Sequence, residues 1–206
     1  MKREELKEWT DSTRKTLDTC REFSKLCCKP FDRGFIGELL VLGRLLETYK
    51  SKLCASAENG FKYAGSAKKG WDISLTLGKK TIYVNAKATT EKGKDKVNPK
   101  WVRQHARNFC NIEVDPRNPV QKVGTKKEVE DDLFYVFVDV RLWKDQGTTN
   151  LFTFSHKEAA KVFGRKYFKS WNGKIRENNP TTDDFWVEYE DVKKFRDPNL
   201  NRLFRK

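Results

Sequence analysis

The sequence predicts an α/β or α+β domain in which a mixed central sheet is flanked by helices. Residues 71–88 alternate polar and apolar side chains on both sides of a short turn, which predicts a β-hairpin. Residues 133–140 form a nearly continuous apolar and aromatic run, typical of a strand buried on both faces. Residues 3–28 and 35–49 carry apolar side chains at helical spacing. These three patterns together require at least two packed layers.

The length and composition predict one domain. The chain has 206 residues, of which 37% are hydrophobic, enough to bury a substantial core. No internal repeat or low-complexity segment is visible. We expect a single domain over 1–206, with an N-terminal helical segment (1–30), a core (31–165) and a C-terminal extension (166–206).

The charge balance favours a polyanionic partner. Lys and Arg total 43 against 29 acids, giving a net charge of +14. Because the excess is spread along the chain, it generates a positive field over the whole domain, as nucleic-acid-binding proteins do. The alternative is that many of these lysines only keep the surface solvated.

The sequence gives no sign of a membrane partner. No segment approaches the roughly 20 apolar residues that span a bilayer. The first residues are charged and lack the apolar core of a signal peptide. We therefore expect a cytoplasmic, DNA-associated protein.

The five cysteines do not form a recognisable framework. They are Cys20, Cys27, Cys28, Cys54 and Cys110. The number is odd and no C-x-x-C spacing occurs, so we expect reduced, mostly buried thiols. Zinc bound by the adjacent pair with a histidine is disfavoured, since adjacent cysteines chelate poorly without a second pair.

The two N-terminal helical patterns differ in character. Residues 3–28 are amphipathic, predicting one or two helices that serve as scaffold. Asp32 is a candidate N-cap for the helix over 35–49, which is apolar nearly all round. Glu38 is the exception, and a carboxylate in such surroundings needs a partner. A buried salt bridge to Arg44 or to a lysine is the ordinary alternative to a functional role.

The hairpin is the most informative part of the sequence. Polar residues on its two strands are Asp72, Ser74 and Thr76, then Thr81, Tyr83, Asn85 and Lys87. Period-2 alternation puts Trp71 on the opposite, apolar face with Ile73. Because cross-strand neighbours share a face, Asp72, Asn85 and Lys87 are expected to converge.

The second half of the chain predicts further elements of the sheet. We expect a helix over 99–111, a long polar loop, then strands over 133–140 and 150–154. Ser155 and Glu158 have the spacing of a capping box that begins another helix.

The order of these elements and polar residues resembles the PD-(D/E)xK nuclease superfamily, the restriction-endonuclease-like fold. In that family a helix Glu, a strand Asp, and an acid or Gln two residues before a Lys surround one or two magnesium ions. The matching positions here are Glu38, Asp72, Asn85 and Lys87. The resemblance covers residues 33–90 in motif and extends to about 155 in element order. The alternative is a solvated polar face on an ordinary hairpin.

The resemblance implies a Mg²⁺ cofactor, with Mn²⁺ as a substitute. Glu38, Asp72 and the Ala86 carbonyl would be the metal ligands, and Lys87 would orient or help to deprotonate the attacking water. This assignment agrees with general chemistry, since Mg²⁺ prefers oxygen ligands and neutralises charge that develops on a phosphate.

Asn85 departs from the commonest family pattern. A neutral amide removes one anionic ligand and weakens metal binding. Three explanations stay open: a natural variant class, an engineered exchange of Asp for Asn, or a protein that has lost catalysis and kept binding.

Other polar residues are candidates for DNA contact. They are Ser66, Lys68 and Lys69 before the hairpin, and Lys100, Arg103, Gln104 and Arg107 on the predicted helix. Solvated surface explains them about as well. His105 and His156 lack the spacing of a zinc pair, which disfavours histidine-based hydrolysis.

These features predict a metal-dependent DNA endonuclease, most simply a homodimeric type II restriction-like enzyme acting on double-stranded DNA. A resolvase or a repair nickase of the same fold fits the same motif. A catalytically weakened DNA-binding protein is a further alternative, and an RNA-binding protein without metal chemistry has the weakest support.

Overall fold

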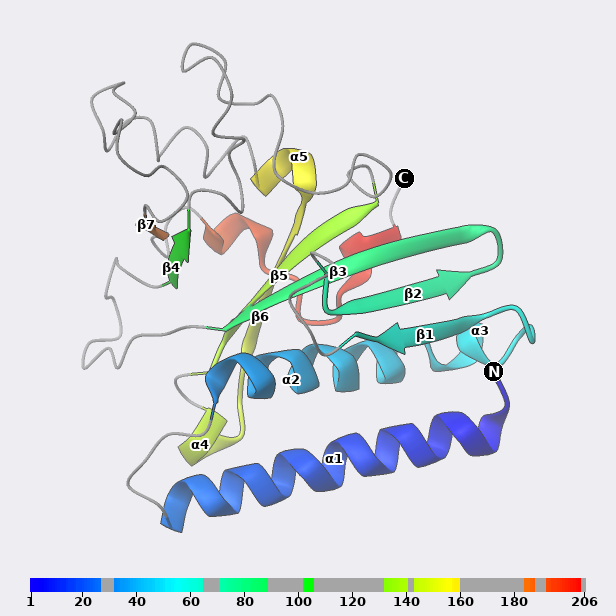
Figure 1. Ribbon diagram of the computed structural model, residues 1–206, viewed down its shortest axis with the longest axis horizontal. Helices are drawn as coiled ribbons and strands as arrows, with labels where there is room; N and C mark the ends of the chain where they lie inside the picture. Colours follow the sequence, from blue (N-terminus) through cyan, green and yellow to red (C-terminus); the bar gives the residue numbers. More distant parts are fainter. Residues whose placement is uncertain are drawn as a thin grey trace.

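The computed structural model describes most of the chain. The described residues are 1–26, 32–64, 71–88, 102–105, 132–140, 143–159, 184–187 and 192–204. They form a mixed α+β structure in which helices flank a five-stranded mixed sheet (Figure 1). The predicted class is therefore confirmed at this level.

Two long helices form the N-terminal part. The first, α1 (Arg3–Leu26), is one continuous helix, and α2 (Arg33–Thr48) begins at the predicted cap. The Asp32 carboxylate accepts the Gly34 N–H at 2.8 Å, which satisfies a backbone donor that the helix itself cannot pair. A short helix, α3 (Lys50–Leu53), follows directly.

The five strands have the order β1-β2-β3-β5-β6. They are β1 (Gly60–Tyr63), β2 (Ile73–Leu77), β3 (Lys80–Ala88), β5 (Leu133–Asp139) and β6 (Asn150–Ser155). Only β3 and β5 pair in parallel, and the other neighbours are antiparallel. The predicted hairpin is the β2–β3 pair, and its turn contains Gly78 at φ 60°, a conformation that favours glycine.

The core lies between the sheet and α2. Apolar side chains at alternate positions of β2, β3 and β5, such as Ile73, Val84 and Val136, form one buried cluster with side chains of α2 such as Leu42. In Figure 1, α1 runs beside α2 on the same side of the sheet. Every residue of β5 is buried, as the sequence predicts for a central strand.

Residues near the C-terminus complete this core. Two short 3₁₀ helices, η5 (Lys193–Phe195) and η6 (Asn201–Phe204), follow one another, and the buried Leu200 and Leu203 belong to the same apolar cluster as α2. The Tyr49 hydroxyl donates to the Leu200 carbonyl at 2.8 Å. The end of the described chain therefore packs against its beginning.

Two further short helices flank β6. They are α4 (Trp143–Gln146), which packs against α1, and α5 (His156–Ala159). The predicted capping box is confirmed, because the Ser155 N–H donates to the Glu158 carboxylate at 2.9 Å and the Glu158 N–H donates to the Ser155 hydroxyl at 3.3 Å.

The helix predicted over 99–111 is wrong where the structure describes it. Residues Val102–His105 form strand β4, which pairs antiparallel with β7 (Asp184–Val187) in a separate two-stranded sheet. Arg103 and Gln104 therefore belong to a strand instead of a helix. A four-residue segment takes its conformation from its partner, and that partner lies about 80 positions later in the chain.

The predicted face of Trp71 is also wrong. Its ring lies 5.3 Å from that of Tyr83, and Tyr83 pairs directly with Ser74. The reason is a shift in the pairing of β2 with β3 at Asp72. Ile73 is the register partner of Val84, yet the Asp72 N–H also donates to the Val84 carbonyl, at 2.8 Å. Two residues opposite one form a β-bulge, which turns the chain and breaks strict alternation.

Candidate active site

The predicted site lies where three strands of the sheet end or begin. There β1 ends at Tyr63, and β2 begins at Ile73. The last paired residue of β3 with β2 is Val84, whereas β3 continues to Ala88 along β5. The end of β3 therefore has β5 on one side and a fork on the other.

Asp72 occupies this fork and is held by the backbone around it. Its carboxylate accepts the Ala86 N–H at 2.7 Å. Its own carbonyl accepts the Ala64 N–H, also at 2.7 Å, which ties it to the end of β1. The residue is 8% exposed, so its carboxylate is both buried and fixed.

The Ala86 carbonyl points into the same fork. In a strand, the N–H and C=O of one residue point to the same side. Because the Ala86 N–H is directed at the Asp72 carboxylate, its carbonyl oxygen lies on that side as well. Two possible ligand oxygens, one from Asp72 just before β2 and one from Ala86 on β3, thus face one region.

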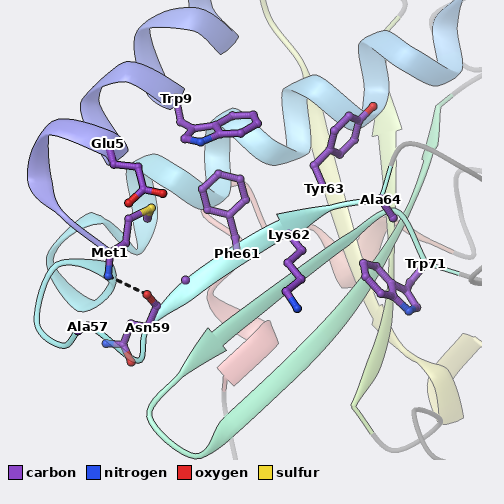
Figure 2. A pocket seen from close by; sticks show the side chains of 11 residues that line it. Met1, Glu5, Trp9, Ala57, Asn59, Phe61, Lys62, Tyr63, Ala64 and Trp71 are labelled. Atoms are coloured by element: carbon purple, nitrogen blue, oxygen red, sulfur yellow. Dashed lines mark hydrogen bonds between the residues drawn. The ribbon is translucent and has the colours of Figure 1, made fainter.

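Glu38 approaches from α2. The Tyr63 hydroxyl donates to its carboxylate at 2.6 Å, reaching toward α2 from the end of β1 (Figure 2). The partner that a half-buried acid requires is thus a tyrosine. Arg44 instead pairs with Glu47 at 3.4 Å, near the end of the helix.

The preceding residue allows this close approach. A Cβ placed on Gly37 would lie 2.9 Å from the Cβ of Ala88, closer than real side chains pack. Glycine at position 37 and alanine at position 88 therefore permit α2 to cross the end of β3 at the level of Glu38.

The two carboxylates and Lys87 interact electrostatically. Burial raises the pKa of Asp72, while the Lys87 charge and the Ala86 N–H act to lower it. Burial also raises the pKa of Glu38, whereas the bond from Tyr63 lowers it, the Asp72 charge raises it and the Lys87 charge lowers it. For both acids the effect of burial on the pKa is the largest, so the pKa stays raised despite the opposing effects of the Lys87 charge and the hydrogen-bond donors.

Asn85 lies beside this cluster. It lies on β3 between Val84, whose carbonyl accepts the Asp72 N–H, and Ala86, whose N–H donates to the Asp72 carboxylate, and it shares a face of the strand with Lys87. Its side chain is half-buried. The structure therefore brings together Glu38, Asp72, Ala86 and Lys87, with Asn85 next to them.

The donor set fits a hard divalent cation. One buried carboxylate, one half-buried carboxylate and a backbone carbonyl are oxygen ligands of the kind that Mg²⁺ accepts, and a cation would compensate the charge of the two acids. Among the described residues, no group of three or more His, Cys, Asp or Glu side chains gathers in one place. Mg²⁺ usually keeps several water ligands and is held by one or two carboxylates, which is compatible with the two acids present here.

Of the predicted DNA-contact residues, the structure describes Arg103 and Gln104. Ser66, Lys68, Lys69, Lys100 and Arg107 lie outside the described residues, as do Cys27, Cys28 and Cys110. Cys20 is a buried free thiol and Cys54 a half-buried one. His156 is buried and stacks on Tyr135, with ring centroids 6.0 Å apart, and Tyr135 is the register partner of Asn85 on the neighbouring strand.

Tyr63 is the site residue that sequence reasoning missed. Burial and the bond to Glu38 both raise the pKa of its hydroxyl, so it stays protonated and donates. The available signal was weak. Phe61 and Tyr63 alternate with Lys62 just before the hairpin, which is compatible with a short strand. That pattern gives no indication that the strand ends beside Glu38.

Comparison with protein-family models, curated proteins and solved structures finds no match to this chain. Within the residues that the structure describes, no helix has the length and apolar character needed to cross a membrane.

Proposed function

We propose that this protein is a metal-dependent endodeoxyribonuclease with a restriction-endonuclease-like fold, which hydrolyses phosphodiester bonds. The observation that supports this most directly is the buried Asp72 carboxylate held by the Ala86 N–H at 2.7 Å, with Glu38 approaching from α2 and Lys87 next to Ala86 on β3. Two acids and one lysine on three different elements are a specific arrangement, and the net charge of +14 suits a polyanionic substrate.

The residues divide into those that hold the metal and one that acts on water. Asp72, Glu38 and the Ala86 carbonyl would hold Mg²⁺, or Mn²⁺ as a substitute. The bound ion would neutralise charge on the phosphate and lower the pKa of a water ligand. Lys87 would orient the attacking water and stabilise the negative charge of the pentavalent phosphorus centre.

Asn85 would weaken this site without abolishing it. An amide oxygen can still coordinate a cation, but it lacks the negative charge of the acid at the matching family position. We therefore expect cleavage that needs more metal than a site with three acids.

Cleavage of supercoiled plasmid and linear phage DNA in Mg²⁺ and in Mn²⁺ tests the proposal. Metal-dependent products should be lost in Lys87→Ala and should increase in Asn85→Asp, roughly tenfold or more at limiting metal. Lys79→Ala is the matched control, because Lys79 is exposed in the turn at the opposite end of the same hairpin. Discrete fragments would indicate a restriction-like homodimer, and nicks or branched-substrate products would indicate a repair nickase or a resolvase.

The alternative function is DNA binding without cleavage, which Asn85 favours. If neither this chain nor Asn85→Asp cuts DNA in either metal while both bind it, the nuclease proposal is wrong. Binding would then be the remaining function of the same surface.

A further inference from the structure

A groove runs along the outer strand of the sheet beside the candidate active site. Its volume is about 610 Å³, and it lies between the start of α1 and the edge strand β1 (Figure 2). The lining residues that matter here are Glu5, Trp9, Phe61, Lys62, Tyr63 and Trp71.

One end of the groove reaches the carboxylate cluster. Tyr63 lines the groove and donates to Glu38 at 2.6 Å. Trp71 lines it as well and directly precedes Asp72. A molecule that lies in the groove would therefore extend to the position where Glu38 and Asp72 would bind their ligand.

The groove presents aromatic rings to solvent. Trp9 is 42% exposed, although it packs edge-on against Phe61 with ring centroids 5.1 Å apart. In Figure 2, Phe61 and Trp9 lie together near the start of β1, and Trp71 lies toward its end. Aromatic side chains left open in this way are typical platforms for stacking nucleobases.

The charges in the groove are compatible with a nucleic-acid backbone. Lys62 is exposed on β1 between Phe61 and Tyr63, and Figure 2 shows its side chain extending away from Trp9. Among the described lining residues the acid is Glu5, which the figure places beside Met1, at the end away from Trp71. Lys62 thus places one positive charge between the end of the groove at Glu5 and the end that reaches the acids.

We propose that this groove binds unpaired bases of a single-stranded DNA segment, by stacking on Trp9 and Trp71, and directs the adjoining phosphate to Asp72. The inference rests on the proposed nuclease function and narrows its substrate to DNA with an overhang, flap or gap near the cut. Bases within an intact duplex are stacked on one another, so they expose no face to these rings unless they are flipped out.

Binding in the absence of metal tests this proposal separately from cleavage. The probes are a fluorescein-labelled (dT)₁₂ strand and a blunt 12-base-pair duplex, followed by anisotropy in EDTA. Trp9→Ala should weaken binding of the single strand on the order of tenfold and leave duplex binding nearly unchanged, since stacking contributes to the single strand alone. Trp9→Phe, which keeps an aromatic face, should retain most of the affinity.

The matched control is Phe23→Ala. Phe23 is the other exposed large apolar residue on α1, is 50% exposed and does not line the groove. Circular dichroism and the thermal midpoint verify that each variant folds. A (dT)₁₂ strand carrying 5-iododeoxyuridine should crosslink to Trp9 or Trp71 under near-ultraviolet light.

The outcomes separate the two proposals. If folded Trp9→Ala and Trp71→Ala bind the strand as well as the unmodified protein, or if the duplex competes equally for the same site, the groove proposal is overturned. If strand binding depends on Trp9 but no DNA is cut under any metal condition, the groove proposal stands and the nuclease proposal falls.

Discussion

The buried carboxylate of Asp72, a residue of the candidate site, lowers the stability of the fold at neutral pH. Burial raises its pKa, so the folded state holds a proton more tightly than the unfolded chain does. Protonation of Asp72 therefore stabilises the folded state. This contribution is fully present below the ordinary aspartate pKa and is lost as the pH rises through the raised pKa. At neutral pH the ionised carboxylate therefore destabilises the metal-free protein.

Replacing this charge with an amide should stabilise the fold. Asp72→Asn keeps an oxygen that can accept the Ala86 N–H. We therefore expect the free energy of unfolding, measured in urea without metal at pH 7.5, to be about 1 kcal/mol larger than that of the unmodified protein. The difference should shrink at pH 4, where the acid is more protonated. Mg²⁺ should raise the thermal midpoint of the unmodified protein more than that of Asp72→Asn, and an equal rise would show that Asp72 is not a ligand.

Under the proposed function Tyr63 is a positioning residue, because its hydroxyl donates to Glu38 and would act on the metal only through that carboxylate. Tyr63→Phe removes a bond that lowers the pKa of Glu38, so this pKa should rise further. Since a metal ligand must be deprotonated, the acid limb of the pH–cleavage profile should move to higher pH and the required Mg²⁺ should increase several-fold.

Tyr49→Phe is the control for this change. Its hydroxyl donates to the Leu200 carbonyl inside the core, remote from the acids. Losing that bond should cost about 1 to 2 kcal/mol of stability while leaving the pH profile in place. If both tyrosine variants move the profile alike, the effect of Tyr63 is one of stability and not of positioning.

At the level of elements, the site depends on how closely α2 crosses β3. Gly37→Ala would bring two Cβ atoms to 2.9 Å, so the helix must shift or the fold must lose about 1 to 3 kcal/mol. Either result should reduce cleavage more than tenfold, because Glu38 is the next residue. Gly43→Ala is the matched control on the same helix, since its new Cβ would lie 3.6 Å from the nearest atom, a methyl carbon of Thr13.

The double variant Gly37→Ala with Ala88→Gly removes the clashing methyl group from the other side. It should recover stability and cleavage relative to Gly37→Ala, as measured by urea unfolding and plasmid cleavage. No recovery, or an equal loss in Gly43→Ala, would mean that the helix–strand approach does not control the site.

The sequence predicts an element well when neighbouring residues determine it, and poorly when distant residues do. The Asp32 cap, the β2–β3 hairpin, β5 and the capping box at Ser155 are encoded in neighbouring residues. Strand β4 is not, because its conformation depends on β7 far along the chain.

The same distinction applies to the candidate site. Its acids and Lys87 stood out as polar groups in apolar or alternating contexts, whereas the bond from Tyr63 and the contact of Gly37 with Ala88 exist only after folding. The shift in pairing at Asp72 is equally tertiary, and it reversed the predicted face of Trp71.

At the scale of the whole molecule, the question is how far charge alone accounts for DNA binding. A net charge of +14 attracts any polyanion, and each phosphate contact releases counterions, so affinity should fall steeply with salt. The groove would add stacking, which is much less sensitive to salt.

These two contributions can be separated by measuring anisotropy of the labelled (dT)₁₂ strand from 50 to 300 mM KCl in EDTA. The logarithm of affinity should decline linearly with the logarithm of salt concentration, with a slope of about −0.7 for each phosphate contacted. Lys62→Ala should reduce the slope by less than about one unit, because one exposed lysine meets one phosphate.

Trp9→Ala should lower affinity by a similar factor at every salt concentration and leave the slope unchanged. A slope near zero for the unmodified protein would show that the positive charge of this chain is not directed at DNA, and a slope that changes in Trp9→Ala would show that Trp9 acts by positioning phosphate contacts and not by stacking.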